Sequence, residues 1–163
     1  MSESDQEKQK KYYPSPELAT TGRVKSMEEY KAKWQKSVDD MEGFWGEEAK
    51  MVDWFTPYTK VWQAPTGHDD QFVGKWYVDG KLNVTYNCLD RWVEKGYGDA
   101  KSLIWIGEDD TEKAYTFSTL KDEVSKYANA LKSLGVVKGD RVCIWLPMIS
   151  ELAVVMLACA RIG

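Results

Sequence analysis

The stretch that decides the fold runs from residue 131 to residue 163 and reads LKSLGVVKGDRVCIWLPMISELAVVMLACARIG. It predicts the end of an amphipathic helix, a glycine-bounded turn, a strand over residues 141–146 and a very apolar helix from about Ile149. The strand is apolar on both faces, as expected where helices cover a sheet on each side. Strand and helix form the first part of a β-α-β unit, whose second parallel strand would follow Gly163. We therefore expect an α/β fold that is incomplete here.

The residues before this stretch predict a long helix and two strands. The helix has apolar residues at spacings of three and four, with Ser118 as its N-cap and Gly135 as its left-handed stop. These residues are Leu120, Val124, Tyr127, Ala128, Leu131 and Leu134. Residues 102–106 and 114–117 read as strands that the acidic loop 107–113 joins.

The first part of the chain predicts small elements rich in aromatic residues. Residues 1–13 are charged and aperiodic, and Ser26 to Glu29 forms a capping box that opens a helix with Tyr30, Trp34 and Val38 on one stripe. A second helix begins near Asp40, carries Phe44, Trp45, Ala49, Val52 and Phe55, and ends at Thr56-Pro57.

Residues 58–70 then read as a loop, and residues 75–82 as a hairpin with Asp79-Gly80 in a type I′ turn. Residues 83–94 predict a short helix, with Leu89, Trp92 and Val93 inward, that Gly96 closes. Helices and a hairpin this dense in Trp suggest a segment that wraps around something larger.

Composition excludes several classes of protein. The chain is 43% hydrophobic and 29% charged, as in soluble globular proteins, and its net charge of −4 offers no basic field for nucleic acid. The longest apolar run, residues 152–160, is about half of a membrane span, and the acidic start is no secretory signal. Cys88, Cys143 and Cys159 lack a CxxC spacing, which favours reduced core thiols in a cytoplasmic protein.

No motif in the chain predicts a catalytic, cofactor-binding or metal site. His68 has no second ligand at metal-binding spacing, and Asp69, Asp70 and the 108–110 acidic run are typical of solvated loops. Asp90-Arg91 is expected to be an internal or domain-packing ion pair. Gly135, Gly139 and Gly163 lack the spacing of a phosphate loop. By its chemistry the segment is a scaffold.

As a whole the chain resembles the N-terminal part of AMP-forming acetyl-CoA synthetases, within the adenylate-forming acyl-CoA synthetase superfamily. The resemblance covers residues 25 to 163. It rests on Phe44-Trp45, Trp54-Phe55, Lys75-Trp76, Gly80 to Asn83, Tyr86 to Arg91, Tyr115 to Phe117, Ala128 to Val136, Lys138 to Val142, Pro147 to Ile149 and Leu157 to Gly163. Trp92 departs from the family, which usually carries His after Asp-Arg.

The resemblance implies an enzyme that makes acetyl-CoA from acetate, ATP and coenzyme A through an acetyl-adenylate, with Mg²⁺, and releases AMP and pyrophosphate. The family's phosphate loop, acyl pocket, nucleotide-contacting residues and catalytic lysine all lie after Gly163. No catalytic, cofactor-binding or metal residue is therefore carried over to this chain, which is expected to be structural and inactive alone. Its partner is the remainder of the synthetase, with no nucleic acid and no membrane.

The resemblance also implies a division of the chain. Residues 1–24 are expected to form a disordered or extended tail, residues 25–98 the wrapping helices and hairpin, and residues 99–163 the truncated start of the adenylate-forming domain. Two alternatives stay open. In the first alternative the chain is a fragment of a propionyl-CoA synthetase. In the second it is a non-catalytic module that binds a protein through its Trp-rich surface.

Overall fold

The computed structural model describes residues 13–65, 67 and 74–163. The chain divides into two compact units, of which the first ends at Ala49 and the second runs from Lys50 to Gly163. No helix among the described residues is long and apolar enough to cross a bilayer.

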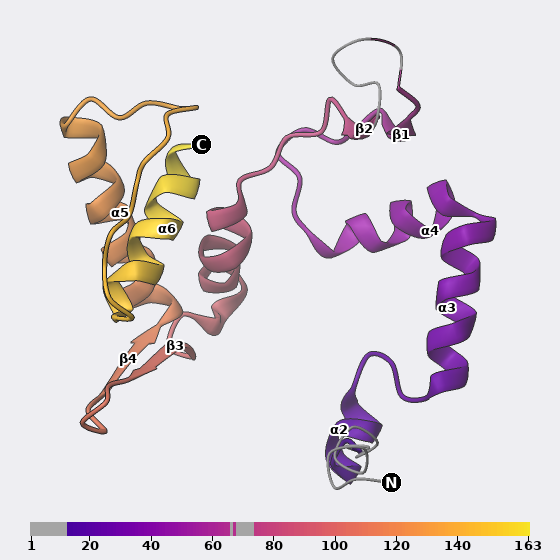
Figure 1. Ribbon diagram of the computed structural model, residues 1–163, viewed down its shortest axis with the longest axis horizontal. Helices are drawn as coiled ribbons and strands as arrows, with labels where there is room; N and C mark the ends of the chain where they lie inside the picture. The colour runs from indigo at the N-terminus through magenta and orange to yellow at the C-terminus, as the bar shows by residue number, and fades with distance from the viewer. Residues whose placement is uncertain (1–12, 66, 68–73) are drawn as a thin grey trace, which may run out of the picture. The chain divides into compact units, whose positions relative to one another are not determined.

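The first unit consists of the helices α2 (Pro16–Thr21), α3 (Met27–Asp39) and α4 (Met41–Glu48) (Figure 1). Helix α2 lies within residues 1–24, for which a disordered or extended tail was predicted. A helix forms there because the Ser15 hydroxyl caps the Leu18 N–H and Pro16 occupies the first turn. The predicted cap of α3 is confirmed, since Ser26 Oγ accepts from the Glu29 N–H at 3.1 Å. The Glu29 carboxylate reaches back to the Lys25 N–H rather than to Ser26.

Helix α4 ends earlier than predicted. It stops at Glu48, and a single 3₁₀ turn, η1 (Ala49–Met51), follows it. The predicted helix up to Thr56-Pro57 is therefore wrong. Asn87 and Arg91 hydrogen-bond the backbone of residues 51–53. The Met51 carbonyl and the N–H and carbonyl of Asp53 therefore pair with side chains and not with a continuing helix.

The predicted hairpin pairs with a different partner. Strand β2 (Lys75–Val78) is antiparallel to β1 (Lys60–Gln63), which lies in the predicted 58–70 loop. Beyond β2 the chain turns at Asp79 (φ 61°) and brings Lys81 against Thr56. Trp54, Tyr58 and Tyr77 pack together with ring centroids 5.1–5.3 Å apart. This aromatic cluster favours pairing with the earlier strand, and alternation within residues 75–82 could not reveal it.

Residues 84–97 form a helix with two π-helical turns, η2 (Tyr86–Asp90) and η3 (Val93–Tyr97). The predicted helix is present and Leu89 is buried, and its helical backbone is broken at Gly96 (φ 86°), as predicted.

The predicted strand pair is confirmed as β3 (Lys101–Ile106) and β4 (Glu112–Thr116), which are antiparallel. Helix α5 (Phe117–Ser133) follows directly, so Phe117 is helical and Thr116, not Ser118, is its N-cap. Thr116 and Thr119 form a reciprocal capping box, while the Ser118 N–H donates to Gly98 O. Gly135 (φ 92°) ends the helix as predicted, with the Val136 N–H on Leu131 O.

Helix α6 (Ser150–Ile162) packs beside α5 (Figure 1) and closes the core. The core consists of Leu89, Tyr115, Leu120, Val124, Ala128, Val154 and Ala158. Within α6 only Ser150, Val154 and Ala158 are buried, and Met156 is 58% exposed, so this very apolar helix buries only one side within the described residues.

Residues 141–146 form no paired strand among the described residues. Val142 and Ile144 are half-buried, whereas Arg141, Cys143 and Trp145 are exposed, the last at 97%. A strand acquires two covered faces only when neighbouring strands and helices surround it. The prediction of such a strand is therefore not met within these residues, which connect α5 to α6 without regular secondary structure.

Candidate functional site

Polar side chains before and within η2 hold the C-terminal half of α6. Asn83 Nδ2 donates to the carbonyls of Ala160 and Arg161, each at 3.1 Å. The Thr85 hydroxyl donates to Leu157 O at 2.7 Å, and Thr85 is fully buried. The last carbonyls of a helix lack intrahelical partners. Asn83 therefore supplies donors where α6 would otherwise leave acceptors unpaired.

Asp90 adds a charged contact to the same helix. Its carboxylate receives Arg161 Nη2 at 2.6 Å and Nη1 at 3.2 Å, and the Asp90 side chain is only 13% exposed. Paired Arg–carboxylate hydrogen bonds fix geometry as well as charge. Arg161 Nε is buried without a hydrogen-bond partner among the described residues.

Arg91, the next residue, contacts a different segment. Its Nη1 donates to Met51 O at 2.8 Å and to Asn87 Oδ1 at 3.0 Å, and lies 3.8 Å from Asp53 Oδ1. Asn87 hydrogen-bonds both the N–H and the carbonyl of Asp53. Residues 83–91 thus contact two separate segments, residues 51–53 and helix α6. We call Asn83, Thr85, Asn87, Asp90 and Arg91, with their partner Arg161, the clamp.

The sequence indicated this site only in part. Asp90-Arg91 was expected to be an internal or domain-packing ion pair. Both residues do form ion pairs, but not with each other: Asp90 pairs with Arg161, and Arg91 with Asp53. The roles of Asn83, Thr85 and Arg161 were missed. One signal pointed to Arg161: a lone cation within an apolar helix needs a buried acceptor.

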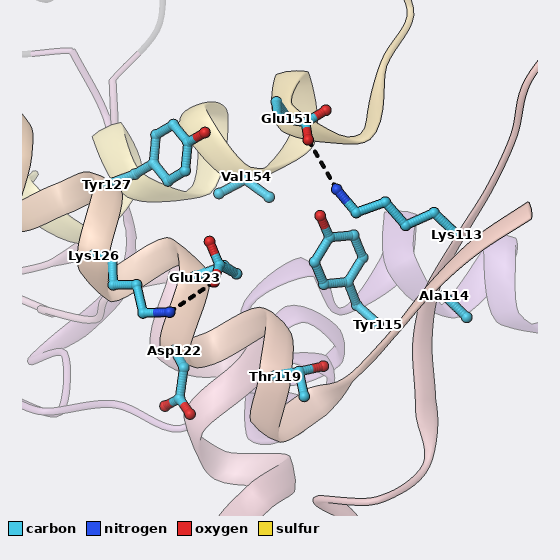
Figure 2. A pocket seen from close by; sticks show the side chains of 10 residues that line it. All are labelled: Lys113, Ala114, Tyr115, Thr119, Asp122, Glu123, Lys126, Tyr127, Glu151 and Val154. Atoms are coloured by element: carbon cyan, nitrogen blue, oxygen red, sulfur yellow. Dashed lines mark hydrogen bonds and ion pairs between the residues drawn. The ribbon is translucent and has the colours of Figure 1, made fainter.

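A cavity of about 480 Å³ lies at the other end of α6, between β4, α5 and the first turns of α6 (Figure 2). Lys113 Nζ lies 2.8 Å from Glu151 Oε1, and the Tyr115 hydroxyl is 3.3 Å from that of the buried Ser150. Across the cavity Lys126 Nζ lies 2.8 Å from Glu123 Oε1.

Each lysine of this cavity is paired with a carboxylate. The Glu151 hydrogen bond raises the pKa of Lys113 well above its ordinary value, and the same bond lowers the pKa of Glu151. A lysine acts as a nucleophile or base only when it is deprotonated. Lys113 therefore stays charged and joins β4 to α6, with no arrangement here that would activate it.

The other residues considered in the sequence do not converge on a site. His68, Asp69 and Asp70 lie outside the described residues. Asp109 Oδ1 accepts from the Thr111 N–H at 3.1 Å, which makes the 108–110 run the turn of the β3–β4 hairpin. Among the described residues no group of three His, Cys, Asp or Glu side chains is placed to hold a metal ion.

The cysteines and Trp92 also have a structural setting. All three cysteines are free, but none is buried, so the prediction of core thiols is wrong. Trp92 packs against Tyr97 and Phe117, with ring centroids 5.8 and 6.1 Å away. The Arg91 guanidinium lies 4.8 Å from the Trp92 ring centroid. Trp92 thus fastens the π-helical segment to the start of α5.

Comparison with known proteins identifies the family. Residues 30–88 match the model described as "Acetyl-coenzyme A synthetase N-terminus", and residues 89–163 match "AMP-binding enzyme". An acetyl-coenzyme A synthetase of Syntrophobacter fumaroxidans is 50% identical over 152 residues, 93% of this chain and 23% of that protein. One of Vibrio parahaemolyticus is 47% identical over 154 residues, again 93% of this chain and 23% of the relative.

The chain belongs to the acetyl-coenzyme A synthetase family. It matches the N-terminal region of that family and spans less than a quarter of the length of these relatives. A solved structure, acetoacetyl-CoA synthetase from Streptomyces lividans, superposes with a TM-score of 0.71 at 28% identity, over 90% of this chain and 22% of that one. The predicted resemblance and the incomplete α/β fold are thereby confirmed. The boundary between the two family matches falls inside η2, so the clamp lies where they meet.

Proposed function

We propose that this chain is the N-terminal scaffold of an AMP-forming acetate–CoA ligase. The complete synthetase converts acetate, ATP and coenzyme A into acetyl-CoA, AMP and pyrophosphate through an acetyl-adenylate, with Mg²⁺, in the cytoplasm. The observation that carries this proposal is the pair of adjoining family matches over residues 30–163. The clamp that joins them supports a scaffolding role, because its charged groups bind other parts of the same unit.

The reaction sets a requirement that such a scaffold serves. A carboxylate is a poor acyl donor until its oxygen becomes a good leaving group, and adenylation makes it one. Metal ions and cationic groups stabilise the charge that develops during phosphoryl transfer only when they are held in place beforehand. We assign this chain no catalytic or ligand-binding residue, and we divide it at residues 24 and 98 into tail, wrapping segment and start of the adenylate-forming domain.

The proposal is tested with the full-length synthetase, the polypeptide in which residues 1–163 are followed by the rest of its reading frame. We expect it to catalyse acetate-dependent exchange of pyrophosphate into ATP, and the 163-residue chain alone to catalyse none. Exchange by the short chain would contradict the scaffold, and absence of exchange by the full-length protein would contradict the ligase. Parallel assays with propionate test the alternative substrate, which the proposal expects to be the poorer one.

A further inference from the structure

The aromatic stripe of α3 is exposed in the first unit. Tyr30, Trp34 and Val38 are 55%, 55% and 59% exposed, and neither α3 nor α4 contains a buried residue. Large contiguous apolar patches on a folded surface mark contacts with other chain segments or other proteins. We therefore expect another chain segment or another protein to pack against this stripe.

The stripe borders a preformed groove. Its volume is about 350 Å³, and its lining includes Tyr30, Trp34, Phe44 and Trp45. Asp40 both ends α3 and caps α4, since its Oδ1 accepts from the Gly43 N–H at 3.0 Å. Arg23 Nη2 lies 3.0 Å from Glu48 Oε2 at the rim. Polar contacts thus hold an apolar groove open without filling it.

The length and exposure of α3 favour a permanent cover over a transient partner. An isolated helix of 13 residues is marginal in water, and most helical stability in proteins comes from packing of the apolar face. Since the first unit buries no residue of α3, the packing must come from outside this unit.

The length of the relatives indicates which segment occupies the groove. This chain covers 23% of the Syntrophobacter fumaroxidans synthetase, so about three-quarters of such a polypeptide lies elsewhere. A covalently joined segment is present at a high effective concentration, which an independent protein must match by affinity. The rim carries both charge signs, Arg23 and Glu48, and so selects for an apolar segment rather than a strongly charged one.

We infer that the Tyr30–Trp34–Val38 stripe and its groove dock an apolar surface of the same polypeptide formed by residues after Gly163. This inference rests on the proposed function only in requiring the full-length synthetase. Docking would hold the N-terminal helices against the body of the enzyme and exclude water from an aromatic face.

The test places a photoreactive benzophenone amino acid at position 34 of the full-length synthetase. Position 31 is the matched control, because Lys31 lies on the same helix but does not line the groove. The protein is prepared as a mixture of isotopically light and heavy copies, and cross-linked peptides are identified by mass spectrometry. We expect position 34 to cross-link to residues after 163 within one copy, with a yield several-fold above that of position 31.

Cross-links between light and heavy copies would assign the groove to a second copy and overturn the inference. Equal yields at positions 34 and 31 would overturn it as well. If the bulky probe at position 34 lowers the yield of folded protein, position 37 replaces it, because Ser37 also lines the groove. Pyrophosphate exchange is measured on the same preparations. Loss of exchange with intact intramolecular cross-links would count against the ligase and not against docking.

Discussion

Arg161 and Asp90 face each other across the contact between α6 and η2, with both guanidinium Nη atoms on the carboxylate at 2.6 and 3.2 Å. The two residues are 71 positions apart and lie in the same family match, beside the Asn83 bonds that come from the other match. The pair therefore adds a charged connection beside the Asn83–Arg161 hydrogen bond, which spans 78 positions.

Replacing Asp90 by Ala removes the acceptor and leaves the Arg161 charge largely buried. Breaking a buried pair in this way costs about 3–5 kcal/mol, and we expect the low end because Arg161 keeps 24% of its side chain exposed. The measurement is hydrogen exchange of the α6 amides in the full-length synthetase, where the free energy of local opening should fall. Lys101→Ala is the control, since its 3.9 Å pair with Glu112 is exposed and is worth less than about 1 kcal/mol. Equal losses in both variants would contradict the role of the clamp.

Thr85→Val tests a neutral contact of the same site. Valine keeps the shape of the buried side chain but cannot donate to Leu157 O. Loss of a buried hydrogen bond that leaves an acceptor unpaired costs about 1–3 kcal/mol. We expect faster exchange in α6 with little change in β1 and β2, and Thr85→Ser should retain most of the protection. A Val variant as protected as the wild type would show that the hydroxyl contributes nothing.

The Lys113–Glu151 pair predicts a pH dependence. Its hydrogen bond holds the pKa of Glu151 below the ordinary value of 4.5 and that of Lys113 above its ordinary value. The contribution of Glu151 is therefore present above about pH 4.5 and is lost as pH falls through its folded pKa. That of Lys113 is present below its ordinary pKa and is lost only in strong alkali.

Because both side chains are more than a third exposed, the pair contributes less than about 1 kcal/mol. Glu151→Gln should lower the melting temperature slightly at neutral pH, and the difference from wild type should vanish in acid. Thermal scans across that pH range measure it. A difference that grows on acidification would show that the pair has the opposite sign.

Gly135→Ala isolates backbone strain. Gly135 has φ 92°, and a Cβ there would meet nothing within 4 Å, so substitution introduces no clash. An L-residue in the left-handed region costs roughly 1–2 kcal/mol. We expect faster exchange at the end of α5, and Gly135→Asn should lose less because Asn tolerates this conformation. Equal exchange in the Ala variant and the wild type would place the helix stop elsewhere.

Elements whose partners lie close in sequence were predictable. The α3 cap and the Gly135 stop depend on residues within one helical turn, and the β3–β4 pair on two strands joined by one short loop. The pairing of β2 with β1 depends on Trp54 and Tyr58, some twenty residues from Tyr77, and alternation alone cannot choose between two turns. Burial of residues 141–146 on both faces was overestimated, because hydrophobicity indicates that a segment is covered but not which residues cover it.

The candidate site divides in the same way. The Asp-Arg pair drew attention as two adjacent opposite charges, but its partners Arg161 and Met51 are 71 and 40 residues away. The π-helical turns that aim the two side chains apart have no sequence signature of the capping kind. Asn83 and Thr85 look like ordinary helix-start residues, and only the position of α6 gives them their function.

The π-helical turn η2 also fixes how many residues the chain must have at this point. Successive residues of an α-helix are about 100° apart around the axis, and those of a π-helical turn are less far apart because its hydrogen bonds span one more residue. Removing one residue between Asn83 and Asp90 would therefore turn Asp90 and Arg91 away from α6 and from residues 51–53 together. A single-codon deletion here would detach both segments at once, whereas each point substitution detaches only one. We therefore expect the spacing from Asn83 to Arg91 to tolerate no change in length, even where its side chains tolerate replacement.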